Sequence, residues 1–450
     1  MRPALDETCR RGIAEGAFPG AVVLAGDSRE ILLHRAYGHR ALAPERLPMT
    51  PDTVFDVSSL TKPMATTTAM MLLVRDGRLR LDDPACTAIP EFGGGDRAAV
   101  TFRQLLNHTS GLPAWRPYYE SVIPAESPNP TPLPLGEGGL RPVPNPTPLP
   151  LGEGGRRPGE GSPTTLPAPS RGLPHPDPLP EGEGDCSRAT VENPDPSPAG
   201  EGDRSRAAAE AAVRKRRVFA QVHAERLEAP PGQRHLYSDL GFILLGEVVE
   251  RLSGRPLDRF CEDEIFAPMG LDSTFLADLS QSAPEPSPVA ARAIAATEDC
   301  PWRGRILCGE VHDDNAYAMG GVAGHAGLFS SAPDMHRFVR FLGRCLDGAE
   351  PDFLPAAVVR EFLETERPLP GQTHVLGWDT PSPAGSSSGR HFSARTVGHL
   401  GFTGTSVWWD LERDLHVVFL TNRVHPSRDN PGIRRYRPLV HDAVMEGLSS

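Results

Sequence analysis

Short apolar runs occur in pairs near both ends of the chain. Residues 21–26 and 31–36 flank the polar dipeptide Asp27-Ser28, which is the pattern of a β-hairpin. Residues 405–409 and 415–420 form a second pair around a short charged segment. Strand pairs at both ends with helices between them predict an α/β fold of the α+β type. We expect an antiparallel sheet that both termini complete, with helices on both of its faces.

Between these pairs, apolar residues recur at helical spacing, and several segments carry start or stop signals. Thr101-x-x-Gln104 is a capping box that predicts the start of a short helix. Ser331-x-x-Asp334, with Pro333 in the first turn, predicts another start. Gly254 predicts the end of an apolar helix over residues 242–252. Further helices are predicted over residues 64–75 and 207–228.

One segment differs from the rest in composition. Residues 128–139 recur letter for letter at residues 144–155, an offset of 144 − 128 = 16 residues, and two degenerate copies follow. Proline removes backbone donors and glycine is costly to order, so this stretch cannot supply a core. We therefore predict a disordered, repeat-bearing insertion at residues 115–206 within one domain formed by residues 1–114 and 207–450. A polyproline ligand for a partner is the alternative, but no proline motif with basic anchors stands out.

Net charge and hydropathy exclude several classes of function. The net charge is −12, and the sequence has no basic segment that would bind nucleic acid or anionic lipid. The chain has no run of about 18 apolar residues, and its first residues include acidic ones where a signal peptide needs an apolar core. The sequence thus predicts a cytoplasmic protein that binds neither nucleic acid nor membrane, and it indicates no protein partner.

The cysteines give no sign of a disulfide framework or a zinc site. There are seven, an odd number, and they are scattered without any C-x-x-C pair. No metal and no other cofactor is predicted.

The first candidate for chemistry is Ser59-Leu60-Thr61-Lys62 at a predicted helix start. Residues three apart share one helix face, so the amine of Lys62 can approach the hydroxyl of Ser59. A serine needs such help to act as a nucleophile, and the amine acts as a base only if burial or nearby cations lower its pKa. Taken alone, the tetrad is more typical of an ordinary N-cap serine followed by a surface lysine.

The second candidate is Tyr237-Ser238-Asp239. A tyrosine beside a cation ionises more readily and can relay a proton, and Asp239 can bind an amine such as Lys62. The alternative is a core tyrosine followed by a residue that caps the next helix.

The third candidate is the glycine-bearing stretch from His399 to Thr405. Gly401 lets a substrate approach the backbone, whose N–H groups can stabilise an oxyanion. His399 offers a positive or hydrogen-bonding edge beside Tyr237. A glycine-rich bend in a strand, without a catalytic role, would have the same sequence pattern.

A further block, residues 310–327, contains His312, Asp313 and His325 among glycines and small residues. A histidine next to an aspartate suggests a metal ligand. The small residues favour instead a tight turn packed beside the site, with His312 and Asp313 pairing locally.

In this order, the three motifs resemble those of the penicillin-binding-protein-like serine hydrolases: class C β-lactamases, D-alanyl-D-alanine carboxypeptidases and related esterases. The flanks at residues 55–62, 105–112 and 237–245 are similar as well. The resemblance covers nearly all of the chain outside the insertion. It implies a β-lactamase/DD-peptidase-like fold, acylation of Ser59, and acid/base work shared by Lys62 and Tyr237. It also implies an oxyanion hole made by the N–H groups of Ser59 and Phe402.

Two departures from the family pattern narrow the predicted substrate. Asp239 stands where an amide typically contacts a β-lactam side chain. His399-Leu400-Gly401 stands in place of Lys-Thr-Gly, which removes a cation and a hydroxyl that would bind a substrate carboxylate. We therefore expect an esterase-like or amidase-like serine hydrolase acting on a small ester, lactone or amide. The alternatives are a β-lactamase or D-alanyl-D-alanine carboxypeptidase, and a non-hydrolytic ligand-binding protein on the same fold.

Overall fold

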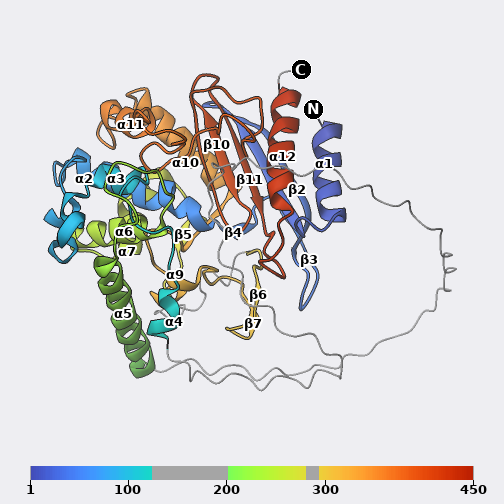
Figure 1. Cartoon of the computed structure of the whole chain (residues 1–450). Coiled ribbons are helices and arrows are strands. Elements are labelled where there is room, and N and C mark those ends of the chain that lie inside the picture. The colour runs from blue at the N-terminus through green and yellow to red at the C-terminus, as the bar shows by residue number, and fades with distance from the viewer. Residues whose placement is uncertain (1, 124–200, 280–292, 449–450) are drawn as a thin grey trace, which may run out of the picture.

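A six-stranded antiparallel sheet forms one side of the molecule (Figure 1). The computed structural model describes residues 2–123, 201–279 and 293–448. Strands from the two ends of the chain meet at the centre of the sheet, where β1 pairs with β11. The strand order is β3-β2-β1-β11-β10-β9. In chain order, the strands are β1 (Gly20–Gly26), β2 (Ile31–Ala41), β3 (Leu47–Pro48), β9 (Thr396–Leu400), β10 (Ser406–Asp410) and β11 (Leu415–Thr421).

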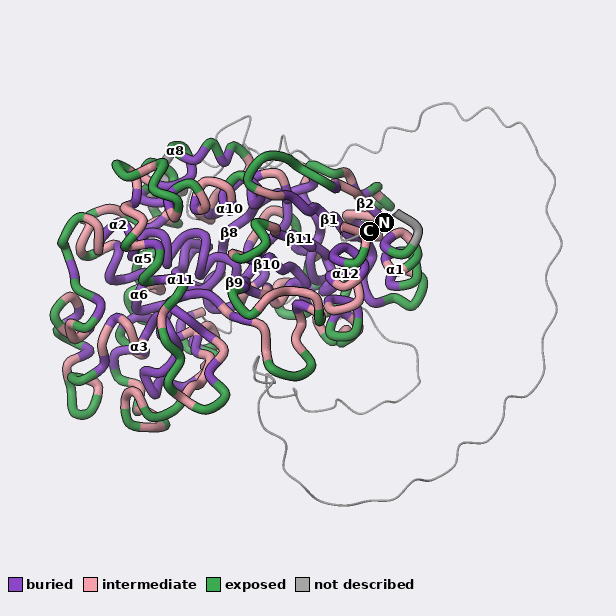
Figure 2. Tube along the Cα trace, turned by 90° about the horizontal axis from the view of Figure 1, so that it is seen from above, coloured by how far each residue is buried: buried purple, intermediate pink, exposed green. Residues whose placement is uncertain are grey.

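Helices cover both faces of this sheet, as the sequence predicted. Alternate residues of β1 face opposite sides, because side chains along a strand alternate. Val22 and Leu24 face the larger apolar core, and Ala21 and Val23 face a smaller one. The helix α10 (Ala332–Leu346) packs on the first face, and the neighbouring helices α1 (Arg2–Ala14) and α12 (Ile433–Leu448) pack on the second. Figure 2 shows the central strands buried between these layers.

The rest of the larger core lies in a helical region beside the sheet (Figure 1). The helix α6 (Asp239–Ser253) is central to it and contacts α2, α3, α5 and α7. The other helices, several of them short, are α2 (Thr68–Arg75), α3 (Phe102–Leu106), α4 (Tyr118–Val122), α5 (Glu201–Ala224), α7 (Leu257–Cys261), α8 (Ala267–Met269), α9 (Asp314–Ala318) and α11 (Ala356–Leu363). None of the helices in the described ranges has both the length and the apolar character needed to cross a membrane.

Two small sheets complete the fold. One joins β4 (Val54–Asp56), β8 (Leu328–Ser331) and β5 (Phe275–Leu276), and the other pairs β6 (Asp299–Cys300) with β7 (Arg305–Ile306). The three-stranded sheet brings residues from the first and last thirds of the chain together directly before Ser59.

The predicted local signals are confirmed. Thr101 and Gln104 form a reciprocal capping box at α3, and Ser331 caps α10 through the Asp334 N–H. Gly254 ends α6 in the left-handed conformation, with φ of 72°. Asp27-Ser28 lies in the connection between β1 and β2, which pair as a hairpin.

The predicted borders of the insertion need correction. Residues 115–123 belong to the ordered part, since they include α4, whose Tyr119 N–H donates to Asn315 Oδ1 at 3.0 Å. The helix α5 begins at Glu201 rather than at residue 207. The central part of the predicted insertion, residues 124–200, lies outside the described residues, and the division into domain and insertion stays a prediction.

Candidate active site

Ser59 lies in a tight turn between β4 and a helix. The turn is a single 3₁₀ turn, Ser58–Leu60, and a π-helical segment, Lys62–Thr67, then leads into α2. Ser58 has a φ of 50°, a conformation unusual for a residue with a side chain. The turn is fixed by Thr61, whose Oγ1 donates to the Ser58 carbonyl at 2.6 Å. Because Lys62 is completely buried, it is not the surface lysine of the alternative interpretation.

Lys62 makes three polar contacts at the centre of the site. Its Nζ lies 3.0 Å from Ser59 Oγ, 2.7 Å from Asp239 Oδ1 and 3.0 Å from the carbonyl oxygen of His325. A buried ammonium is stable only with such partners. Burial disfavours the charged form, but the Asp239 carboxylate and Tyr237 outweigh it and hold the pKa of Lys62 above its usual value. Lys62 is therefore a cation in the resting site.

Tyr237 reaches the same point from the start of α6. Ser238 caps this helix by accepting from the Gly241 N–H, as expected, and its hydroxyl donates to the Pro113 carbonyl at 2.6 Å. Lys62 Nζ lies 5.1 Å from the centroid of the Tyr237 ring. The Tyr237 hydroxyl is buried beside Lys62 and Ser59, yet it makes no well-formed hydrogen bond to any described group. Burial raises the pKa of Tyr237, and the charge of Lys62 opposes that rise.

The turn between β9 and β10 lies against the two residues that precede the Ser58-Ser59 pair. Thr403 Oγ1 donates to the Asp56 carbonyl at 2.7 Å, and Thr405 Oγ1 donates to the Val57 carbonyl at 3.1 Å. Within the described part of the chain, the N–H of Phe402 has no hydrogen-bond acceptor. The turn thus presents a free backbone donor next to the strand that leads to Ser59.

Gly401 allows this close approach, and Gly401→Ala is expected to impair it. A Cβ at this position would lie 2.5 Å from the Val57 carbonyl oxygen and 2.0 Å from Thr405 Oγ1. The turn must then move, which should lower the free energy of unfolding by about 1–3 kcal/mol and reduce turnover. Thermal unfolding and steady-state kinetics check this. Gly343→Ala is the control, because a Cβ there would make only an ordinary contact, 3.4 Å from Trp409 Cζ2. Full activity of Gly401→Ala would show that the turn has no part in the reaction.

His399 lies beside Tyr237, with ring centroids 6.0 Å apart, but it is not the positive group that the sequence allowed. Burial, then the charge of Lys62, holds the pKa of His399 well below its usual value. Its Nδ1 donates to the Leu400 carbonyl at 2.9 Å, which leaves Nε2 as an acceptor. This buried Nε2 has no partner among the described residues.

Two more histidines lie beside Tyr237 and a third contacts them, and the sequence motifs did not assign the three a place in the site. The ring centroids of His108 and His374 lie 4.5 Å and 5.5 Å from that of Tyr237, and His235 Nε2 lies 3.2 Å from His374 Nδ1. Burial lowers the pKa of His374 to about 3 and that of His235 to about 4. These residues come from separate loops, so no local pattern marks them as neighbours.

The block at residues 310–327 supports the site, but not through the pairing predicted for it. His312 Nε2 lies 3.3 Å from Glu298, and Asp313 pairs with His325 Nε2 at 2.9 Å. Asp313 also caps α9 by accepting from the Ala316 N–H. His312 and Asp313 therefore do not pair with each other. No cluster of three or more possible metal ligands occurs in residues 2–123, 201–279 and 293–448.

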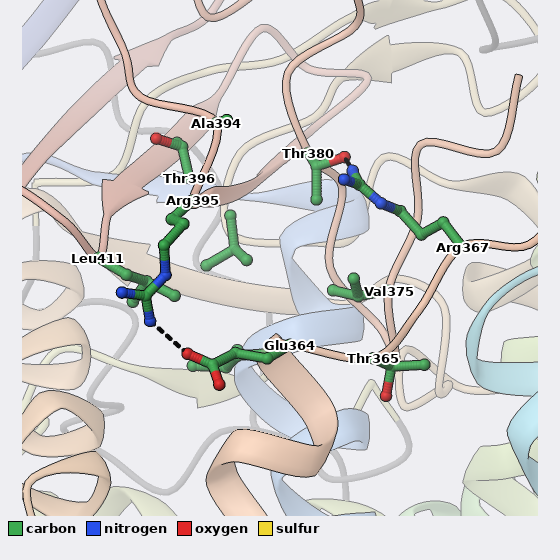
Figure 3. Close-up of a pocket in the computed structure, with 11 residues that line it drawn as sticks. Glu364, Thr365, Arg367, Val375, Thr380, Ala394, Arg395, Thr396 and Leu411 are labelled. Atoms are coloured by element: carbon green, nitrogen blue, oxygen red, sulfur yellow. Dashed lines mark hydrogen bonds and ion pairs between the residues drawn. The ribbon is translucent and has the colours of Figure 1, made fainter.

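A separate open pocket of about 400 Å³ has Val375 and Thr380 in its lining (Figure 3). Arg395 and Glu364 form an ion pair at one side of it, and Arg367 contacts Thr380 at the other. Neither Ser59, Lys62 nor Tyr237 lines this pocket, so it is distinct from the candidate active site.

The chain is similar to known proteins in sequence and in fold. The chain matches the family profile described as "Beta-lactamase" over residues 5–128 and 192–442. A protein of Salmonella schwarzengrund (strain CVM19633), named "Putative D-alanyl-D-alanine carboxypeptidase", is 34% identical over 215 residues. The aligned region covers 46% of this chain and 49% of that protein, so the chain spans about half the length of the curated relatives it matches.

Solved structures share the fold at low identity. "EstCE1, a hydrolase with promiscuous acyltransferase activity" superposes with a TM-score of 0.61 and 19% identity, covering 98% of this chain and 97% of that one. The octameric penicillin-binding protein homologue from Pyrococcus abyssi gives a TM-score of 0.60 and 18% identity, covering 98% of this chain and 77% of that one. At these identities, the similarity establishes the fold alone.

Proposed function

Because the chain belongs to the β-lactamase family of penicillin-binding-protein-like serine hydrolases, we propose that it hydrolyses a small ester or amide through an acyl-enzyme on Ser59. The observation that carries the proposal is the 3.0 Å contact between Ser59 Oγ and the buried Nζ of Lys62. A non-hydrolytic binding protein would have no need of a buried cation held against a serine hydroxyl.

The ion pair between Lys62 and Asp239 supports a division of the two acid/base roles within this proposal. One proton must leave the Lys62–Tyr237 pair before either group can act as a base. Since Asp239 stabilises the ammonium form of Lys62, that proton is taken from Tyr237. The Tyr237 phenolate then accepts the Ser59 proton, and Lys62 remains a cation beside both oxygens.

The acylation step follows from these roles. Ser59 Oγ attacks the substrate carbonyl carbon, and the N–H groups of Ser59 and Phe402 bind the oxyanion that forms. When the tetrahedral intermediate collapses, Tyr237 returns its proton to the leaving oxygen or nitrogen. Water then hydrolyses the acyl-enzyme, again with Tyr237 as the base.

Asp239→Asn is expected to shift the pH profile of kcat/KM to lower pH. The carboxylate of Asp239 raises the pKa of Lys62 and also that of Tyr237, so the active, singly deprotonated pair forms only at higher pH in the parent. Removing the negative charge makes the pair lose its proton more easily. Rates measured from pH 5 to pH 10 with a neutral ester test this, and a profile that stays in place or moves to higher pH would contradict the assignment.

The wall of the site supports a substrate without a carboxylate near its leaving group. His399 presents a neutral acceptor, and His374 and His235 are neutral as well, because burial lowers the pKa of all three. A carboxylate would therefore meet no charged histidine here. The buried Arg437, whose charge acts on His399, already donates to the Gly401 and Thr405 carbonyls. We therefore favour an ester or lactone over a peptide with a free carboxyl end. The second candidate, a D-alanyl-D-alanine carboxypeptidase, is supported by the name of the relatives that match half of the chain.

A substrate panel separates these candidates. Nitrophenyl esters of short acids, a chromogenic cephalosporin and a peptide ending in D-alanyl-D-alanine are assayed with the parent chain. We expect the esters to have the highest kcat/KM. Faster release of D-alanine than ester hydrolysis would favour the carboxypeptidase, and tight binding of an ester without turnover would favour a binding protein.

A further inference from the structure

A buried carboxylate lies three residues before Ser59. Asp56 ends β4 between the buried side chains of Phe55 and Val57, and only 2% of its surface is exposed. A carboxylate in such a position is costly unless its oxygens accept hydrogen bonds. Both of its oxygens do so, and each bond reaches a different part of the proposed active site.

The first bond holds the nucleophile turn. Asp56 Oδ1 accepts from the Ser58 N–H at 2.8 Å. Ser58 is the residue with a φ of 50°, and such a conformation persists only where its surroundings enforce it. This bond therefore helps to set the direction in which the next residue, Ser59, presents its hydroxyl.

The second bond reaches the segment that supports Lys62 and Phe402. Asp56 Oδ2 accepts from the His312 N–H at 2.7 Å. The His312 ring stacks on the Phe402 ring, with centroids 5.7 Å apart and an interplanar angle of 25°. The residue after His312 is Asp313, which pairs with His325, and the His325 carbonyl accepts from Lys62.

A third bond joins the backbone of Asp56 to the oxyanion turn. The Asp56 carbonyl accepts from Thr403 Oγ1 at 2.7 Å, and Thr403 directly follows Phe402. One residue thus contacts the nucleophile turn, the 312–325 segment and the turn that carries the free N–H of Phe402.

We propose that Asp56 is a positioning residue that holds the Ser59 hydroxyl and the Phe402 N–H in the relative geometry that acylation requires. The inference rests on the proposed function. A displacement of about 1 Å between a nucleophile and its oxyanion donors can cost about 100-fold in rate. Asp56 touches neither the substrate nor the reacting atoms and acts through the two turns.

The test compares Asp56→Asn with Asp334→Asn. An asparagine keeps the shape but has only one acceptor oxygen, so its NH₂ group opposes one of the two backbone donors. Asp334 is a matched control because it is equally buried and both of its oxygens accept hydrogen bonds. Its Oδ2 accepts from the Ser273 N–H at 2.6 Å and from Thr274 Oγ1 at 2.9 Å, and its Oδ1 pairs with Arg337 at 2.6 Å. Folding is monitored by circular dichroism and thermal unfolding. Ester kinetics and the inhibition constant of phenylboronic acid report on the site, because the boronate forms a tetrahedral adduct with the serine.

We expect Asp56→Asn to lower kcat by about 10- to 100-fold and to change KM by less than about threefold. The inhibition constant of phenylboronic acid should rise by about the same factor as kcat falls. Asp334→Asn should lose a comparable amount of thermal stability and leave both constants within about threefold of the parent. If Asp56→Asn fails to fold, Thr403→Val removes the third bond and should lower kcat by about three- to tenfold.

Two results would overturn the proposal: equal kinetics in Asp56→Asn and Asp334→Asn, or a rise in KM at constant kcat. In the second case, Asp56 would contribute only to ground-state binding. Failure of the proposed function would be seen in a different comparison, the rate of ester hydrolysis by the parent against that by Ser59→Ala. Equal rates there would reject the proposed function itself.

Discussion

Ser59→Ala is expected to reduce hydrolysis of a nitrophenyl ester by about 10⁴-fold or more, because the variant has no oxygen to form the acyl-enzyme. The fold should persist, since Lys62 keeps its contacts with Asp239 and with the His325 carbonyl. The melting temperature and the initial rate are measured on the same preparation. An acylated peptide containing Ser59, found by mass spectrometry in the parent alone, would identify the nucleophile directly.

The adjacent serine provides the matched control. Ser58 is also buried, but its known contacts run through the backbone, so Ser58→Ala should keep its rate within about tenfold of the parent. If Ser59→Ala hydrolyses esters as fast as the parent, the assignment of the nucleophile is wrong. If Ser58→Ala is the inactive variant, the nucleophile is one residue earlier than proposed.

Tyr237→Phe is expected to lower kcat by about 10²- to 10⁴-fold without reducing stability. The Tyr237 hydroxyl is buried and makes no well-formed hydrogen bond to a described group, so its removal breaks no bond that holds the fold. Its near polar neighbours are Lys62 and Ser59, within the site itself, so the variant should melt at about the same temperature as the parent. A loss of activity combined with unchanged stability is typical of a functional group rather than a core residue.

Tyr118→Phe should show the opposite pattern. The Tyr118 hydroxyl, at the start of α4, donates to Oε1 of Glu225, the residue after α5, at 2.8 Å. Its loss should cost about 1 kcal/mol of unfolding free energy and leave turnover unchanged. If instead Tyr237→Phe loses stability and keeps its kcat, Tyr237 is a core residue and the proton passes through another group.

Local signals in the sequence were sufficient for several elements of the fold. The hairpin around Asp27-Ser28, the capping box at Thr101 and the cap at Ser331 depend on residues within a few positions of each other, and all are present. Their interactions are short in sequence, so neighbouring side chains decide them. The start of α5 was less well predicted, because its first residues follow directly on a stretch of proline and glycine that hides the helical pattern.

The sequence alone also brought Ser59 and Lys62 together, because a spacing of three residues is close in space on any helical turn. It left undecided whether Lys62 was a surface residue or a buried cation. Only tertiary structure decided this, by placing Asp239 and the His325 carbonyl, from distant parts of the chain, against the same amine.

The charges and pairings within the site were decided in the same way. His399 is neutral because burial removes water from its ring, and His312 pairs with Glu298 rather than with Asp313. No sequence motif marked Asp56, and its bonds to Ser58 and His312 emerged only with the fold. A sequence determines which groups are available and which near neighbours meet. Burial and contacts between distant segments determine which of those groups are charged and what they bind.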